Sequence, residues 1–120
     1  MTAKKVLHKF EHAMAYNYRW LSQALDDMSN EIEYVAKEFG LKAAKRAESR
    51  VYEGVQQLCR FPYSGMRYEE DLFYNNHEVR VLHLHQVSLI YSFDNEMITL
   101  IALWNNYKNP DRLIEVIESR

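Results

Sequence analysis

The run from Val79 to Trp104 constrains the fold of this chain more than any other stretch. Branched and aromatic residues dominate it, it contains no glycine or proline, and the polar triplet Asp94-Asn95-Glu96 interrupts it. Such residues favour strands, and a short break with Asp and Asn favours a hairpin. The run therefore predicts antiparallel strands. The first covers residues 79–84 and turns near His85-Gln86.

Apolar residues alternate with a period of two along the last two strands of this run, which predicts one strongly apolar sheet face. We expect that face to carry Val87, Leu89, Tyr91 and Phe93 on one strand and Ile98, Leu100, Ala102 and Trp104 on the next. A sheet with such a face needs a cover from elsewhere in the chain.

Two helical patterns precede the sheet. In the first, apolar residues recur every three or four positions from Leu21 to Phe39, Ser22 is the predicted N-cap, and Gly40 ends the pattern. The second follows at once and ends at Phe61-Pro62, because proline cannot continue the helical hydrogen bonds. Two amphipathic helices with so short a link form an antiparallel hairpin, which is the expected cover. We expect its buried residues to be Leu25, Met28, Ile32, Val51, Val55 and Leu58.

The flanks complete the predicted architecture. Residues 16–21 predict an edge strand, and Asp111 is predicted to cap a final helix that runs through Ile117. The fold class is therefore α+β: an antiparallel helical hairpin packed on an antiparallel sheet of three to five strands, with a short C-terminal helix. We interpret residues 16–120 as the folded domain and residues 1–15 as an N-terminal appendage. The spacing of Val6, Leu7 and Phe10 in the appendage predicts the apolar stripe of a short helix, and we expect Lys4, Lys5 and Lys9 to keep it soluble.

Composition narrows the class of protein. The chain has 120 residues, 48% of them hydrophobic and 27% charged, which is typical of one globular domain. The single cysteine, Cys59, cannot form an internal disulfide, and we expect it to be a small core residue in a cytoplasmic protein. No apolar run approaches the ~20 residues of a membrane helix, and the first residues lack the apolar region of a signal peptide.

The net charge of −2 is unevenly distributed. Residues 40–68 hold six Lys or Arg against two Asp or Glu, a charge of +4, whereas residues 69–120 hold four against nine, a charge of −5. The basic island either contacts an anionic partner or is a solvated helix face. His83 and His85 share a predicted strand face, but with no third ligand evident we expect a polar surface and no metal or cofactor.

The order of these pieces resembles the RelE/ParE superfamily, the toxin half of bacterial type II toxin–antitoxin pairs. The resemblance spans roughly residues 16–112. Its motifs are Phe61-Pro62-Tyr63-Ser64-Gly65, Arg67, Arg80, Leu89-Ile90-Tyr91, Ile101-Ala102-Leu103-Trp104 and Asn109-Pro110.

The resemblance implies a small α/β fold and one of two activities. RelE-like members cut mRNA in the ribosomal A site, ParE-like members poison DNA gyrase, and an antitoxin wraps and silences both. The positions that match catalytic positions of the family are Arg67, Arg80, Tyr107 and Lys108. In a ribonuclease, the arginines would clamp the scissile phosphate beside the loop after Trp104, Lys108 would add charge, and Tyr107 would pass a proton. The resemblance implies no membrane partner and leaves a homodimer open.

Two departures favour a second interpretation. Many family members carry His, Asp or Arg just after the last strand, where this chain has Asn105 and Asn106, and an amide is neither acid nor base at neutral pH. The mildly acidic charge also disfavours binding to RNA. The alternative is a non-catalytic binding module, either a gyrase inhibitor or a degenerate member of the family.

Overall fold

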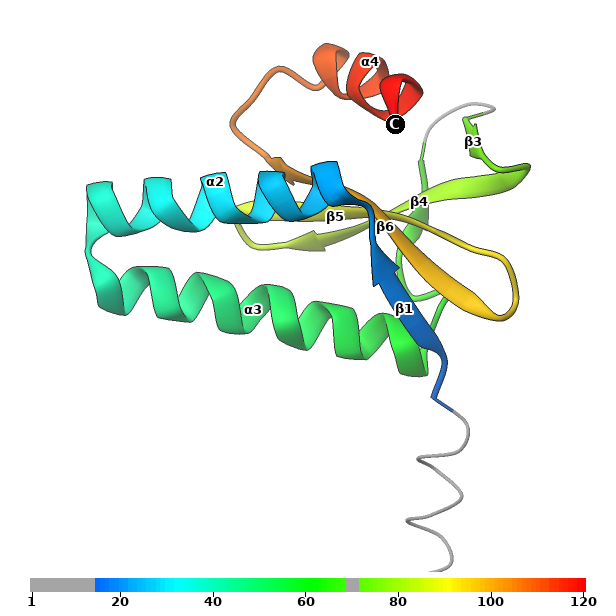
Figure 1. The fold of residues 1–120 in the computed structure, drawn as a ribbon, viewed down its shortest axis with the longest axis horizontal. Coiled ribbons are helices and arrows are strands. Elements are labelled where there is room, and N and C mark those ends of the chain that lie inside the picture. The colour runs from blue at the N-terminus through cyan, green and yellow to red at the C-terminus, as the bar shows by residue number, and fades with distance from the viewer. Residues whose placement is uncertain (1–14, 69–71) are drawn as a thin grey trace, which may run out of the picture.

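The computed structural model describes residues 15–68 and 72–120, so the short helix expected in the 1–15 appendage lies outside the described residues. A sheet is covered on one face by a helical hairpin and on the other by a C-terminal helix (Figure 1). The helices are α2 (Ser22–Phe39), α3 (Leu41–Arg60) and α4 (Asp111–Ser119). The strands are β1 (Asn17–Trp20), β2 (Met66–Arg67), β3 (Phe73–Tyr74), β4 (His77–Leu84), β5 (Val87–Phe93) and β6 (Met97–Asn105).

The sheet confirms the α+β class but is mixed rather than antiparallel throughout. Among the described residues it has six strands in the order β1-β6-β5-β4-β2, and β3 pairs with β4 off this path. β1 runs parallel to β6, with Tyr18 opposite Ile98 and Trp20 opposite Leu100, while the other pairs are antiparallel. β1 is thus an edge strand, as predicted. Its direction was missed because periodicity carries no information on which way a neighbour runs.

A β-bulge in β6 breaks the predicted alternation. Ile90 pairs with Ala102 and Tyr91 pairs with Leu100, so Ile101 is an extra residue. An extra residue turns the rest of the strand to the other face. Leu100 and Leu103 therefore both pack under the helical hairpin, whereas Ala102 and Trp104, expected on that face, pack with α4. The backbone N–H of Leu103, two residues past Ile101, donates to Asp27 Oδ2 of α2 at 3.2 Å.

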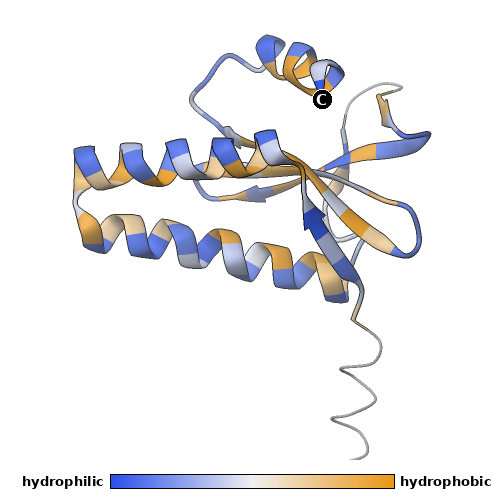
Figure 2. Cartoon of the chain, viewed as in Figure 1, coloured by the Kyte–Doolittle hydropathy of each residue, from blue (hydrophilic) through white to orange (hydrophobic). Residues whose placement is uncertain are grey.

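Both faces of the sheet are apolar, not one as expected. The first core joins α3 to Leu89, Tyr91, Leu100 and their neighbours, and the second joins α4 to Val79, Ile90 and theirs. Figure 2 shows apolar residues concentrated along β6 and on the side of α2 that faces α3. The second core is closed at its end by Arg120, which donates to both oxygens of Asp27 (2.9 and 3.1 Å) and to the carbonyl of Ile101 (2.9 Å).

α3 supplies most of the cover, and α2 less than predicted. Val51, Val55 and Leu58 are buried as expected. Gly54 permits this contact, because a Cβ there would lie 2.8 Å from Leu84 Cδ1. In α2 the prediction was wrong for Leu25, which is 49% exposed. Met28 and Ile32 are half-buried, so the buried residues of α2 are Ala24 and Val35.

The helix ends differ from the predicted caps by one residue. Leu21, not Ser22, holds the N-cap position of α2, because Ser22 is already helical. Pro110, not Asp111, holds that of α4, and Asn109 Oδ1 accepts from the Asp111 N–H at 3.0 Å. Gly40 ends α2 as predicted, with a φ of 91° that disfavours other residues.

Leu89→Ala should lower the free energy of unfolding by about 2–5 kcal/mol, because Leu89 is fully buried in the first core. Leu25→Ala is the matched control and should change it by less than ~1 kcal/mol, since half of that side chain is already in water. Urea melts of the two variants measure both values. Equal losses would mean that α2 buries Leu25 after all.

Candidate functional site

The turn Phe61–Gly65, which carries much of the family resemblance, is fastened to the sheet by Tyr91. The buried Tyr91 hydroxyl donates to the carbonyl of Pro62 at 2.7 Å and accepts from the N–H of Gly65 at 3.1 Å. A Cβ at Gly65 would lie 2.6 Å from the hydroxyl and 2.7 Å from the carbonyl of Val81, so this close approach requires glycine. Burial raises the pKa of Tyr91, and the neighbouring Arg80 only partly offsets this, so the hydroxyl keeps its proton.

Arg80 also binds this turn. Its guanidinium donates to the carbonyls of Gly65 at 2.7 Å and Tyr63 at 3.4 Å, lies 5.2 Å from the centre of the Tyr63 ring, and pairs with Glu78 at 3.4 Å. Only 16% of its side chain is exposed. Arg67 lies opposite Arg80 across β2 and β4, with its Nε 3.7 Å from Glu78. The structure therefore brings the two predicted arginines together around one carboxylate.

Tyr107 and Lys108 lie at the other end of the sheet. Arg80 is opposite Tyr91, whereas Asn105 is opposite Val87, four residues along β5 and so about 13 Å away. The arginines therefore do not lie beside the loop after Trp104, as the sequence had led us to expect. Tyr107 is 82% exposed, and the Nζ of Lys108 lies 5.6 Å from the centre of the Trp104 ring. The four predicted residues form two separate groups.

The asparagines after β6 hold this loop in place. Asn105 donates to both oxygens of Glu31 in α2 (3.2 and 3.3 Å) and accepts from the N–H of Tyr107 at 2.9 Å. Asn106 donates to the carbonyl of His85 at 3.4 Å, which directs its Oδ1 toward the hydroxyl of Ser88 at 2.7 Å.

His83 belongs to the same network. Its Nδ1 lies 2.7 Å from Ser88 Oγ. Because Asn106 Oδ1 can only accept, the Ser88 hydroxyl donates to it, so His83 Nδ1 carries a proton and Nε2 is the acceptor when the ring is neutral. His85 is in the β4–β5 turn with φ 41°, so strand alternation does not place it beside His83. Sequence analysis missed this orientation of His83; the signal was the pairing of His83 with Ser88 across the hairpin.

An apolar groove, which sequence analysis also missed, lies on the β1 side of the hairpin. One hollow of about 520 Å³ is lined by Tyr18 and Trp20 of β1, Leu25 and Met28 of α2, and the Glu48–Val55 part of α3. A second of about 510 Å³ continues it toward Leu41 and shares Met28 and Glu48 with the first. We call the two together the α2–α3 groove. Tyr18, Leu25 and Tyr52 are 45%, 49% and 59% exposed in it.

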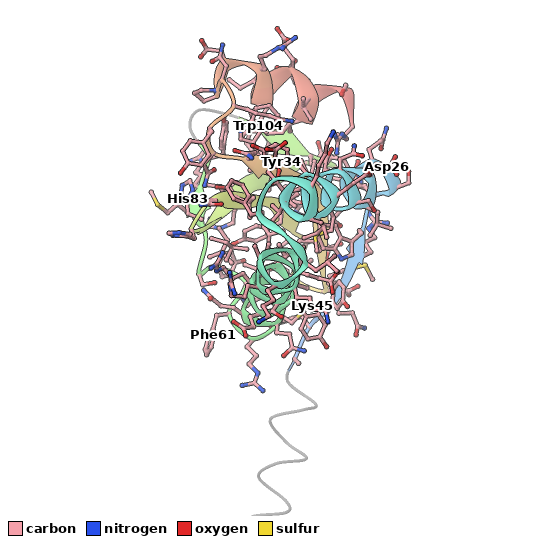
Figure 3. All side chains as sticks on the ribbon, turned by 90° about the vertical axis from the view of Figure 1, so that its left-hand side faces the viewer. Asp26, Tyr34, Lys45, Phe61, His83 and Trp104 are labelled. Carbon is pink, nitrogen blue, oxygen red and sulfur yellow. The ribbon has the colours of Figure 1, made fainter. Side chains whose placement is uncertain are left out.

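Figure 3 places this groove relative to the other features. Viewed along the hairpin, Lys45, which lines the second hollow, lies on the side where β1 runs, whereas His83 and Phe61 lie on the opposite side. Tyr34 and Trp104 lie between α2 and α4, where they line a further hollow of about 500 Å³ with Tyr107 and Lys108.

A helical hairpin on a mixed sheet with a short C-terminal helix is the architecture of a small RelE/ParE-type toxin domain. A family model described as "ParE toxin of type II toxin-antitoxin system, parDE" matches residues 18–109, so the chain belongs to the ParE toxin family. Its fold is similar to a solved structure from P. aeruginosa, described as a chromosomal ParDE TA system. That similarity has a TM-score of 0.62 and 17% identity and covers 77% of this chain and 97% of the other. No curated protein matches the chain.

Within residues 15–68 and 72–120, no group of three or more His, Cys, Asp or Glu side chains is placed to hold a metal ion. None of the helices in this part of the chain has the length and apolar character needed to cross a membrane.

Tyr91→Phe should lower the free energy of unfolding by about 1–3 kcal/mol, because it leaves the Pro62 carbonyl and the Gly65 N–H buried without their partner. Tyr63→Phe is the matched control. Its hydroxyl donates to Asn95 at 3.2 Å on the surface, so its loss should change stability by less than ~0.5 kcal/mol. Thermal or urea unfolding measures both, and an unchanged Tyr91→Phe would show that the turn does not depend on this hydroxyl.

Proposed function

We propose that this chain is a type II toxin that arrests growth by binding a protein target, DNA gyrase, and that a cognate antitoxin neutralises it by binding in the α2–α3 groove. The family supports the toxin role. The similar solved structure is described as a ParDE toxin–antitoxin system, which supports an antitoxin partner.

The separation of the candidate residues is the observation that supports binding to a protein target over cleavage of RNA. Cleavage of RNA needs a base, an acid and cations around one phosphate. Here Arg80 is engaged by main-chain carbonyls and Glu78, while Tyr107 lies at the opposite end of the sheet. Binding to a protein needs no such assembly.

One observation favours a second candidate, ribosome-dependent cleavage of mRNA. The Ser88–Asn106 network fixes His83 with Nε2 as an acceptor, which suits a general base. His83 is exposed, and its network reaches the loop that holds Tyr107 and Lys108. In this second function, His83 and Tyr107 would transfer protons, and Arg67 and Arg80 would have a structural role only.

Inducible expression with labelled precursors separates the two functions. For a gyrase poison, thymidine incorporation should fall before amino-acid incorporation, and His83→Gln and Tyr107→Phe should remain toxic. For an mRNA nuclease, amino-acid incorporation should fall first, and loss of the acid or base should reduce cleavage by about 10²–10⁴-fold. Glu118→Gln, at an exposed position of α4, is the control for expression and handling.

Co-expression with the product of the neighbouring gene tests the antitoxin. We expect a complex that co-purifies and relieves growth arrest, and we expect Leu25→Glu or Tyr52→Glu to abolish it because each puts a charge into the apolar groove. Ile114→Glu is the matched control, since Ile114 is 38% exposed on α4, across the sheet from the hairpin. A complex that forms with both groove variants would show that the antitoxin binds a different surface of the toxin. The absence of any complex would remove the main support for a toxin–antitoxin pair.

A further inference from the structure

We infer that a hollow between the helical hairpin and the β4–β5 turn binds the phosphate group of a nucleotide. The hollow has a volume of about 370 Å³, and residues of α2, α3 and the turn line it. None of the residues that carry the proposed function or its alternative is among them. The polar side chains and the larger apolar ones that line the hollow are Arg46, Arg50, His85 and Gln86 with Val35 and Phe39.

Two arginines form one wall of the hollow. Arg46 and Arg50 are four positions apart in α3, so they lie on the same side of the helix, one turn from each other. Like charges at this spacing repel. Within the described part of the chain, no carboxylate pairs with either guanidinium to offset the repulsion. A bound anion would offset it, and the planar fork of N–H donors on each guanidinium suits phosphate oxygens.

The β4–β5 turn forms a second wall with His85 and Gln86. Asn106 fixes this turn, because its main-chain N–H donates to the Gln86 carbonyl at 2.9 Å and its side chain donates to the His85 carbonyl at 3.4 Å. Both contacts use main-chain atoms of the turn. The imidazole and the amide are exposed, and in residues 15–68 and 72–120 neither side chain has a hydrogen-bond partner. Donors from two elements therefore face one hollow without a protein acceptor.

This arrangement distinguishes between the two interpretations of the basic island. Lys45 of the same helix lines a hollow together with Glu33 and Glu48, so carboxylates balance its charge locally. Among the described residues that line the hollow of Arg46 and Arg50, there is no Asp or Glu. A solvated helix face does not require basic side chains to gather around a concave surface without acids. This part of the basic island is therefore an anion site.

The donors and an aromatic side chain favour a nucleotide phosphate over a carboxylate. The oxygens of a phosphate are arranged tetrahedrally, so they can accept from both walls at once, whereas the two oxygens of a carboxylate lie in one plane. Phe39 lines the same hollow, is 66% exposed, and meets the ring of Tyr34 edge-on with the ring centres 6.4 Å apart. An exposed aromatic ring beside a positively charged groove is the combination that binds bases by stacking. The base would therefore lie against Phe39.

A chemical-shift titration of the full chain with adenosine monophosphate tests the inference. We expect the amides around Arg46 and Arg50 and those of the β4–β5 turn to shift. Arg46→Gln/Arg50→Gln should weaken binding about tenfold or more, because the change removes two charge-assisted donors. Lys42→Gln/Lys45→Gln is the matched control, since it removes the same charge from α3 outside the hollow. It should weaken binding by less than about twofold, because salt screens distant exposed charges.

Three further probes define the ligand. Adenosine, which lacks the phosphate, should bind about tenfold or more weakly than its monophosphate. Phe39→Ala should weaken binding of the monophosphate and leave binding of inorganic phosphate unchanged. A short single-stranded oligonucleotide distinguishes the two sources of the phosphate. Tighter binding than that of the mononucleotide, falling with salt, would identify a nucleic-acid strand, and equal binding would identify a free nucleotide.

Four results would overturn the inference. The first is the absence of any shift with the phosphate-bearing probes at millimolar concentration, and the second is adenosine binding as tightly as its monophosphate. The third is an equal loss in the arginine and lysine pairs, because binding would then follow the overall charge of α3. The fourth is a glutamate-rich peptide that binds as tightly as the mononucleotide and needs the same arginines, which would assign the hollow to an acidic protein. An unchanged affinity of Phe39→Ala for the monophosphate would overturn the position of the base. Neither growth arrest nor antitoxin enters these measurements, so this inference and the proposed function can fail separately.

Discussion

The hydrogen bonds of the Tyr91 hydroxyl are the interaction on which the rest of this structure depends. One phenol in the centre of the sheet satisfies two main-chain groups of the turn that follows α3. That turn redirects the chain from the helical layer to β2, and β2 in turn brings Arg67 opposite Arg80. Glycine at position 65 is required by the same contact. The position of the helical hairpin on the sheet and the placement of the arginines are thus set at one buried point.

This dependence explains why the family motifs predicted the fold better than the site. The Phe61–Gly65 motif and Arg80 are held by contacts within the domain, and the Asn105-Asn106 pair fastens a loop to α2 and the β4–β5 turn. Residues used in this way produce a recognisable sequence signature whether or not chemistry occurs beside them. The α2–α3 groove, which exposes Leu25, Leu41 and Tyr52, carries none of these motifs.

The sequence was informative where one periodicity dominates. Gly40 between two helical stripes and Asp94–Glu96 between two apolar runs marked the helical hairpin and the β5–β6 hairpin correctly. It was uninformative in β6, where Ile98 to Trp104 is apolar at every position except Thr99, so the pattern cannot register a bulge or a second core. Leu25 fits the stripe of α2 by spacing, yet lies at its solvent side. The pairing of β2 with β4 places Arg67 opposite Arg80. The distance from Arg80 to Tyr107 depends instead on which end of the sheet each residue occupies, and spacing along the chain does not reveal this.

The bulge at Ile101 joins parts of the molecule that share no core. It lets one strand supply side chains to both layers, and Leu103, two residues further on, gives its amide hydrogen to Asp27. Asp27 also receives the guanidinium of Arg120, which binds the carbonyl of Ile101. One inserted residue, one carboxylate and the final arginine therefore form a closed loop of contacts through α2, β6 and α4. A displacement of α2 on the sheet would therefore break contacts of the chain end that follows α4, although the two helices cover opposite faces of the sheet.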